Sequence, residues 1–69
     1  MKLSARNILR GEVVSIAKGA VNSEIIIQFP GGDQIVSVIT NSSVENLELK
    51  KGKPAYAVIK ASNVMIGID

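Results

Sequence analysis

The chain has 69 residues, of which 46% are hydrophobic, a formal net charge of +2, and no His, Cys or Trp. The absence of Cys excludes disulfide bonds and thiolate metal sites, and the net charge is too small to indicate a nucleic-acid-binding protein by itself. A single domain spanning residues 1–69 has difficulty hiding so much apolar surface, so we expect it to assemble with copies of itself.

The first half of the chain has the pattern of three strands. Residues 8–16 and 23–29 are rich in β-branched side chains, and the first of these segments contains Gly11, where we expect a bend or bulge. The turn sequence Pro-Gly-Gly-Asp at 30–33 leads into a third strand over 34–40. The second and third strands should therefore form a hairpin.

A short helix is predicted over 41–47. Thr40 or Asn41 can cap its first turn, and Val44 and Leu47 lie three residues apart on one helix face.

Two more strands are predicted at 56–60 and 64–68, with a polar corner at 61–63 between them. Three strands, a helix and two strands is the order of the OB-fold. We therefore predict an all-β, OB-fold-like five-stranded Greek-key barrel with one short helix between strands three and four. The alternative, an SH3-like barrel, has no helix at that point.

Both faces of the predicted strands are apolar. One face holds Ile25, Ile27, Ile35, Ile39 and Ile59, and the opposite face holds Val14, Ile26, Val36, Val38 and Val58. A small barrel buries only its inner face, so the second apolar face indicates a partner.

Two polar clusters stand at opposite ends of the chain. Ser4-Ala5-Arg6-Asn7 and Lys60-Ala61-Ser62 each combine a cation, a hydroxyl and a small residue whose backbone N–H can approach a ligand. A tetrahedral oxyanion offers only acceptors and needs such donors. The clusters can meet within one subunit or across an interface. A frayed terminus and a solvated strand end are the alternatives.

Two further segments offer donors to an anion. Thr40 and Ser43 lie at the predicted helix start, where plain capping is the alternative function. The segment Lys18-Gly19-Ala20-Val21-Asn22 can present backbone N–H groups as an anion nest, or it is an ordinary turn.

No enzyme chemistry is visible. The chain lacks a His or Cys nucleophile or base, its carboxylates are scattered, and no cation site is indicated. Polar residues follow Met1 and Lys2 in place of an apolar signal segment, and no apolar run reaches the ~20 residues of a membrane span. We therefore expect a cytoplasmic protein without a membrane partner.

The motifs together resemble the molbindins, small cytoplasmic molybdate-binding proteins built from a single TOBE (transport-associated OB) domain. The resemblance rests on Ser-Ala-Arg-Asn at 4–7, Gly11, Lys18-Gly19, the Ile39-Thr40 step followed by Ser43-Val44, and Val58-Ile59-Lys60-Ala61-Ser62 with Val64.

The resemblance implies storage of molybdate or tungstate at intersubunit sites of a homo-oligomer, a hexamer built as a trimer of dimers. It also implies that Ser4, Ala5 and Arg6 of one subunit face Lys60, Ala61 and Ser62 of another, with Thr40 nearby. A second oxyanion site is expected around Lys18, Gly19, Val21 and Asn22. No cofactor beyond the anion is implied.

Two other functions fit an OB-like barrel. A single-stranded nucleic-acid binder needs stacking aromatic residues, but Phe29 and Tyr56 are the only aromatic side chains, which disfavours a nucleic-acid partner. In a purely structural oligomeric module, Arg6 and Lys60 would instead satisfy nearby acceptors, and molybdate would add no stability.

Overall fold

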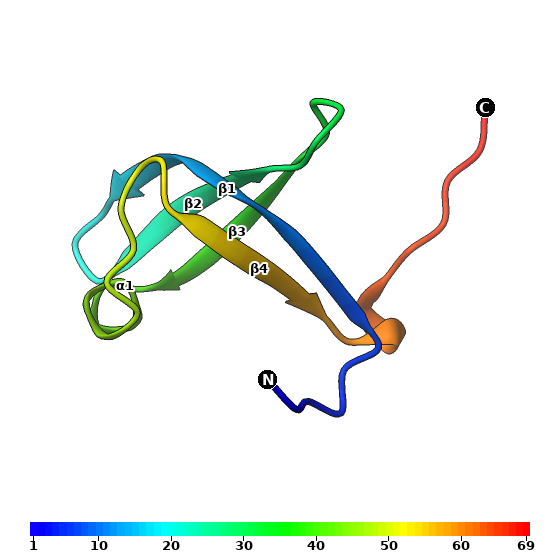
Figure 1. The fold of residues 1–69 in the computed structure, drawn as a ribbon, viewed down its shortest axis with the longest axis horizontal. Coiled ribbons are helices and arrows are strands. Elements are labelled where there is room, and N and C mark those ends of the chain that lie inside the picture. Colours follow the sequence, from blue (N-terminus) through cyan, green and yellow to red (C-terminus); the bar gives the residue numbers. More distant parts are fainter.

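A computed structural model describes all residues, 1–69, and has one curled antiparallel sheet with a short helix (Figure 1). The elements are β1 (Asn7–Lys18), β2 (Asn22–Gln28), β3 (Gln34–Thr40), α1 (Asn41–Asn46), β4 (Pro54–Ile59) and the short 3₁₀ helix η1 (Ala61–Asn63). The strand order across the sheet is β3-β2-β1-β4. The predicted all-β class with one short helix after the third strand is confirmed.

The predicted fifth strand at 64–68 is wrong for the single chain. The sheet has four strands, and residues 64–69 lie outside any strand or helix. The pattern of apolar residues was suited to a strand, but a strand also needs a neighbour for its backbone groups, and this segment has none in its own chain.

β1 is irregular at Val14 and not at Gly11. Val13 pairs with Ile27 and Ser15 pairs with Ile26, so Val14 is the extra residue of a bulge. Gly11 serves a different purpose, because a Cβ there would lie 2.6 Å from the carbonyl oxygen of Gln28. The bulge lets β1 bend across the sheet, and the side chains that face the core before and after it remain on the core side.

The predicted hairpin between β2 and β3 is confirmed by their antiparallel pairing. The turn is closed by the Phe29 N–H, which donates to the Asp33 carbonyl over 2.8 Å. Gly31 and Gly32 have φ values of 100° and 99°, a region that favours glycine.

α1 begins and ends with local hydrogen bonds. Thr40 is its N-cap, and its Oγ1 accepts from the Ser43 N–H over 3.1 Å. At the other end Glu48 has a φ of 53°, and the Leu49 N–H donates to the Val44 carbonyl over 3.0 Å. After this Schellman ending, Leu49 packs against the core, as Val44 does, whereas Leu47 is exposed.

The core lies on the concave face of the sheet and is small. Val13, Ile25, Ile27 and Ala57 form its buried apolar cluster. The opposite face is exposed and apolar as expected, with Val36, Val38 and Val58 among its residues. Neither helix has the length and hydrophobicity that crossing a bilayer requires.

Candidate functional site

The pairing of β1 with β4 brings the two predicted clusters together. Asn7, the first residue of β1, is the backbone partner of Ile59, the last residue of β4. Antiparallel pairing therefore places the residues before Asn7 beside those after Ile59. A pocket of about 210 Å³ lies there, and its lining consists of the six predicted residues: Ser4, Ala5, Arg6, Lys60, Ala61 and Ser62. We call it the cationic pocket.

Both clusters meet within one chain. The residue pattern left open whether they meet within a subunit or across an interface, and the resemblance implied the second arrangement. In the structure, one chain supplies both halves of the pocket. The pocket is open, since every lining residue except the half-buried Ala5 is exposed.

Local structure orients the second half of the pocket. Lys60 is the N-cap of η1, and its carbonyl accepts from the Asn63 N–H over 2.9 Å. The N–H groups of Ala61 and Ser62, in the first turn, have no intrahelical acceptor. Small side chains at 61 and 62 keep these N–H groups approachable from the pocket.

The charge of the cationic pocket has one sign. Its lining includes the guanidinium-bearing Arg6 and the ammonium-bearing Lys60, and no carboxylate. Ser4 and Ser62 add hydroxyls, which can orient their hydrogen toward an acceptor. An anion with acceptors on every side matches this donor set. A cation does not, and no group of three or more His, Cys, Asp and Glu residues is placed to hold a metal ion.

Thr40 lies at the other end of the sheet. Its backbone partner is Asn22, at the start of β2, whereas the cationic pocket adjoins the start of β1. The Thr40 hydroxyl also donates to Ser43 Oγ over 2.9 Å, consistent with capping. One chain therefore does not bring Thr40 to the cationic pocket.

The segment predicted to form a second oxyanion site, residues 18–22, lies next to the start of α1. Asn41 Nδ2 donates to the Gly19 carbonyl over 3.0 Å, and the Asn41 N–H donates to the Val21 carbonyl over 2.8 Å. The Gly19 N–H donates to the Asn22 carbonyl over 2.8 Å. In a single chain this turn is closed on itself, with the Gly19 N–H already used and the Lys18 side chain exposed.

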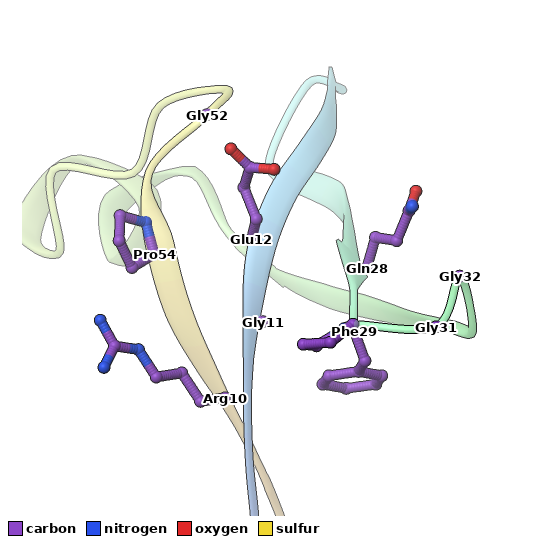
Figure 2. A pocket seen from close by; sticks show the side chains of 10 residues that line it. Arg10, Gly11, Glu12, Gln28, Phe29, Gly31, Gly32, Gly52 and Pro54 are labelled. Atoms are coloured by element: carbon purple, nitrogen blue, oxygen red, sulfur yellow. The ribbon is translucent and has the colours of Figure 1, made fainter.

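A larger hollow, of about 620 Å³, lies beside the β2–β3 turn and was not predicted from the sequence. Figure 2 shows Arg10 and Glu12 on either side of Gly11 on β1, with Phe29 across from them. The glycines at 11, 31, 32 and 52 are the only signal that could have indicated it. Arg10 and Glu12 carry opposite charges, so this hollow suits a dianion less well than the cationic pocket does.

A comparison with family models decides the classification: the TOBE domain matches residues 3–66. The chain belongs to the TOBE-domain family. This TOBE chain is 48% identical over 69 residues, the full length of both proteins, to a probable molybdenum-pterin-binding protein of Haemophilus influenzae. It is 46% identical over 66 residues to molybdenum-pterin-binding protein 3 of Clostridium pasteurianum, covering 96% of this chain and 97% of the relative.

Solved structures agree with this classification. MopII of Clostridium pasteurianum has a TM-score of 0.91 at 43% identity, covering 97% of the TOBE chain and all of MopII. ModG, described as a cytoplasmic molybdate-binding protein and solved with molybdate bound, has a TM-score of 0.95 at 51% identity. The match to ModG covers the whole TOBE chain and 49% of ModG. The molbindin-type resemblance is thereby confirmed.

Proposed function

We propose that this TOBE protein binds molybdate or tungstate in the cationic pocket. The observation that carries the proposal is that six residues from the two ends of the chain line one pocket with two cations and no carboxylate. The relatives that are named or described as molybdenum-pterin- or molybdate-binding support the choice of anion. Arg6 and Lys60 would neutralise the dianion, and Ser4, Ser62 and the backbone at Ala5 and Ala61 would complete the donors.

Selectivity among oxyanions follows from donor chemistry. Molybdate at neutral pH is fully deprotonated, so it only accepts hydrogen bonds. Phosphate retains a proton at that pH, and a pocket without a carboxylate offers this proton no strong acceptor. Sulfate is also fully deprotonated, and therefore only the dimensions of the closed pocket can select against it.

A homo-oligomer would close the pocket. Five of its six lining residues are exposed in the single chain, and an anion bound there would stay largely hydrated. The outer face carries Val36 at 58% and Val38 at 65% exposure, an apolar surface that a second copy would cover. We propose a hexamer, a trimer of dimers, with the anion sites between subunits.

Assembly would also bring together predicted site residues that lie apart in the single chain. Thr40 of a neighbouring copy would approach the cationic pocket, and Lys18, Gly19, Val21 and Asn22 would form a second oxyanion site together with other copies. Because the Gly19 N–H already has an acceptor, that site would depend on Lys18 and the Asn22 side chain.

The physiological role proposed is storage and homeostasis of the anion in the cytoplasm by residues 1–69 acting as a single TOBE domain. Binding without catalysis fits a chain with no His or Cys to act as base or nucleophile.

Isothermal titration calorimetry tests the proposal. The protein is titrated with molybdate, tungstate, sulfate and phosphate under the same conditions. Saturable heats with molybdate or tungstate, and at least tenfold weaker binding of sulfate and phosphate, are expected. Absence of molybdate binding, or equal affinity for sulfate, would refute the assignment.

A further inference from the structure

The turn between β1 and β2 is held in place by one residue of α1. Asn41 donates from Nδ2 to the Gly19 carbonyl over 3.0 Å and from its backbone N–H to the Val21 carbonyl over 2.8 Å. Its Oδ1 accepts from the hydroxyl of Ser23. Figure 1 shows the turn lying beside α1. Both polar atoms of the Asn41 side chain are therefore used to hold the turn and the start of β2.

The side chain of Asn41 is not needed to begin the helix. Thr40 is the N-cap of α1, and its hydroxyl accepts from the Ser43 N–H. Asn41 instead serves Ser23, the only buried polar residue, which is 3% exposed. A buried hydroxyl needs a partner, and Asn41 Oδ1 accepts from it. This bond fixes the direction of the Asn41 amide, with Nδ2 toward the Gly19 carbonyl.

The contact with Gly19 fixes the orientation of one peptide group. No peptide bond in the chain is cis, so the Gly19 carbonyl and the Ala20 N–H point in opposite directions. Because the carbonyl is directed at Asn41, the Ala20 N–H points away from this side chain. That N–H makes no backbone hydrogen bond. Glycine has the freest backbone of all residues, so without the Asn41 side chain this peptide group would be free to rotate.

The turn also lies beside the cation of the proposed second oxyanion site. Lys18 lines a small pocket of about 80 Å³ together with Ser23 and Asn41. Glu45 lines it as well, so the charge there is mixed, unlike the charge of the cationic pocket. A dianion is then less fully neutralised, and a neutral N–H of fixed direction contributes a larger share of the binding.

We infer that Asn41 is a positioning residue of the second oxyanion site, holding the Gly19–Ala20 peptide so that the Ala20 N–H donates to the bound anion. The donors expected there, Lys18 and the Asn22 side chain, thereby gain a backbone N–H. The inference rests on the proposed function, because it takes the anion to be molybdate or tungstate. Loss of a hydrogen bond to a charged group is expected to weaken binding on the order of tenfold.

Amide NMR spectra recorded during a molybdate titration test the inference at single residues. In the parent, the signals of Ala5 and Ala61 report on the cationic pocket, and the signal of Ala20 reports on the second site. Asn41→Ala should weaken the affinity measured at Ala20 on the order of tenfold and leave the affinity at Ala5 and Ala61 within twofold. Asn46→Ala is the matched control, because Asn46 is an exposed asparagine at the other end of α1. It should leave all three signals responding as in the parent.

A second variant separates positioning from a merely structural role. Asn41→Ala leaves the Ser23 hydroxyl buried without its acceptor, so it should also lower the unfolding temperature. Combining Asn41→Ala with Ser23→Ala removes that hydroxyl, and we expect part of the lost stability to return while the affinity at Ala20 stays weak. If the affinity at Ala20 returned together with the stability, the inference would be overturned.

The inference and the proposed function can fail separately. If Ala5 and Ala61 respond to molybdate and Ala20 does not, or if Asn41→Ala leaves the affinity at Ala20 unchanged, the inference is wrong and the cationic pocket stands. If Ala20 alone responds and Asn41→Ala weakens that response, the cationic pocket is wrong and the inference stands. If no amide responds, both are wrong.

Discussion

Asn7 and Ile59 are backbone partners at the end of the β1–β4 ladder, and this one pairing sets Arg6 beside Lys60. Residues 54 positions apart in sequence thereby become neighbours through the register of two strands. A change of register by one residue would turn the side chains of one of the two strands to its other face and shift the residues before Asn7 relative to those after Ile59. The cationic pocket is thus a product of the fold.

Arg6 should be required for anion binding. In the closed pocket that we propose, Arg6→Ala removes one of the two positive charges that neutralise the desolvated anion, and we expect molybdate affinity to fall on the order of 30-fold or more. Calorimetric titration measures the change. Arg10→Ala is the matched control, because Arg10 lies on the same strand but lines the larger hollow. Equal affinity of Arg6→Ala and the parent would show that the anion binds elsewhere.

Lys60 should affect binding and leave assembly intact. Lys60→Met keeps the aliphatic stem and removes the charge, so molybdate affinity should fall at least tenfold while the molar mass stays that of the parent. Lys51→Met removes a charge from a loop outside the cationic pocket and should leave affinity within twofold. Similar losses in both variants would mean that the general positive charge, and not the cationic pocket, attracts the anion.

The small core makes Ile25 important for stability. Ile25 is 2% exposed, and Ile25→Ala should lower the free energy of unfolding by about 2–5 kcal/mol through lost burial and a cavity. Val21, in the turn before β2, is 69% exposed, and Val21→Ala should change stability by at most about 0.5 kcal/mol. Urea unfolding at a fixed protein concentration compares them. Equal stability of the two variants would contradict the assigned core.

Gly11 should not tolerate a side chain. A Cβ at this position would lie 2.6 Å from Ile27 Cγ2 as well as from the Gln28 carbonyl oxygen, so Gly11→Ala should cost about 1–3 kcal/mol. Gly67→Ala meets no atom within 4 Å and serves as the control. Thermal unfolding of both variants checks this. An unchanged midpoint for Gly11→Ala would show that β1 and β2 are less closely packed at this point.

Much of the fold could be predicted because it depends on local patterns. The Pro30–Asp33 turn determines the β2–β3 hairpin, and Thr40 with Ser43 determines the start of α1. The fifth strand was predicted wrongly for the single chain because the apolar pattern at 64–68 says that a strand is possible and not that a neighbouring strand is available to pair with it. The Val14 bulge was missed because two β-branched residues in a row look like regular strand.

The candidate site could be predicted in composition but only partly in arrangement. The residue types in Ser4-Ala5-Arg6 and Lys60-Ala61-Ser62 indicated an oxyanion, and the two clusters do line one pocket. That they meet within one chain follows from the β1–β4 register, which no local pattern specifies. The distance of Thr40 from this pocket likewise depends on where β3 ends in the sheet.

Native mass spectrometry, with molybdate and with sulfate as control, tests the central claim most directly. The account predicts an oligomer that gains discrete molybdate masses, loses them with Arg6→Ala, and gains none from sulfate. A protein that takes up no molybdate, or takes up both anions equally with Arg6→Ala unaffected, would contradict it.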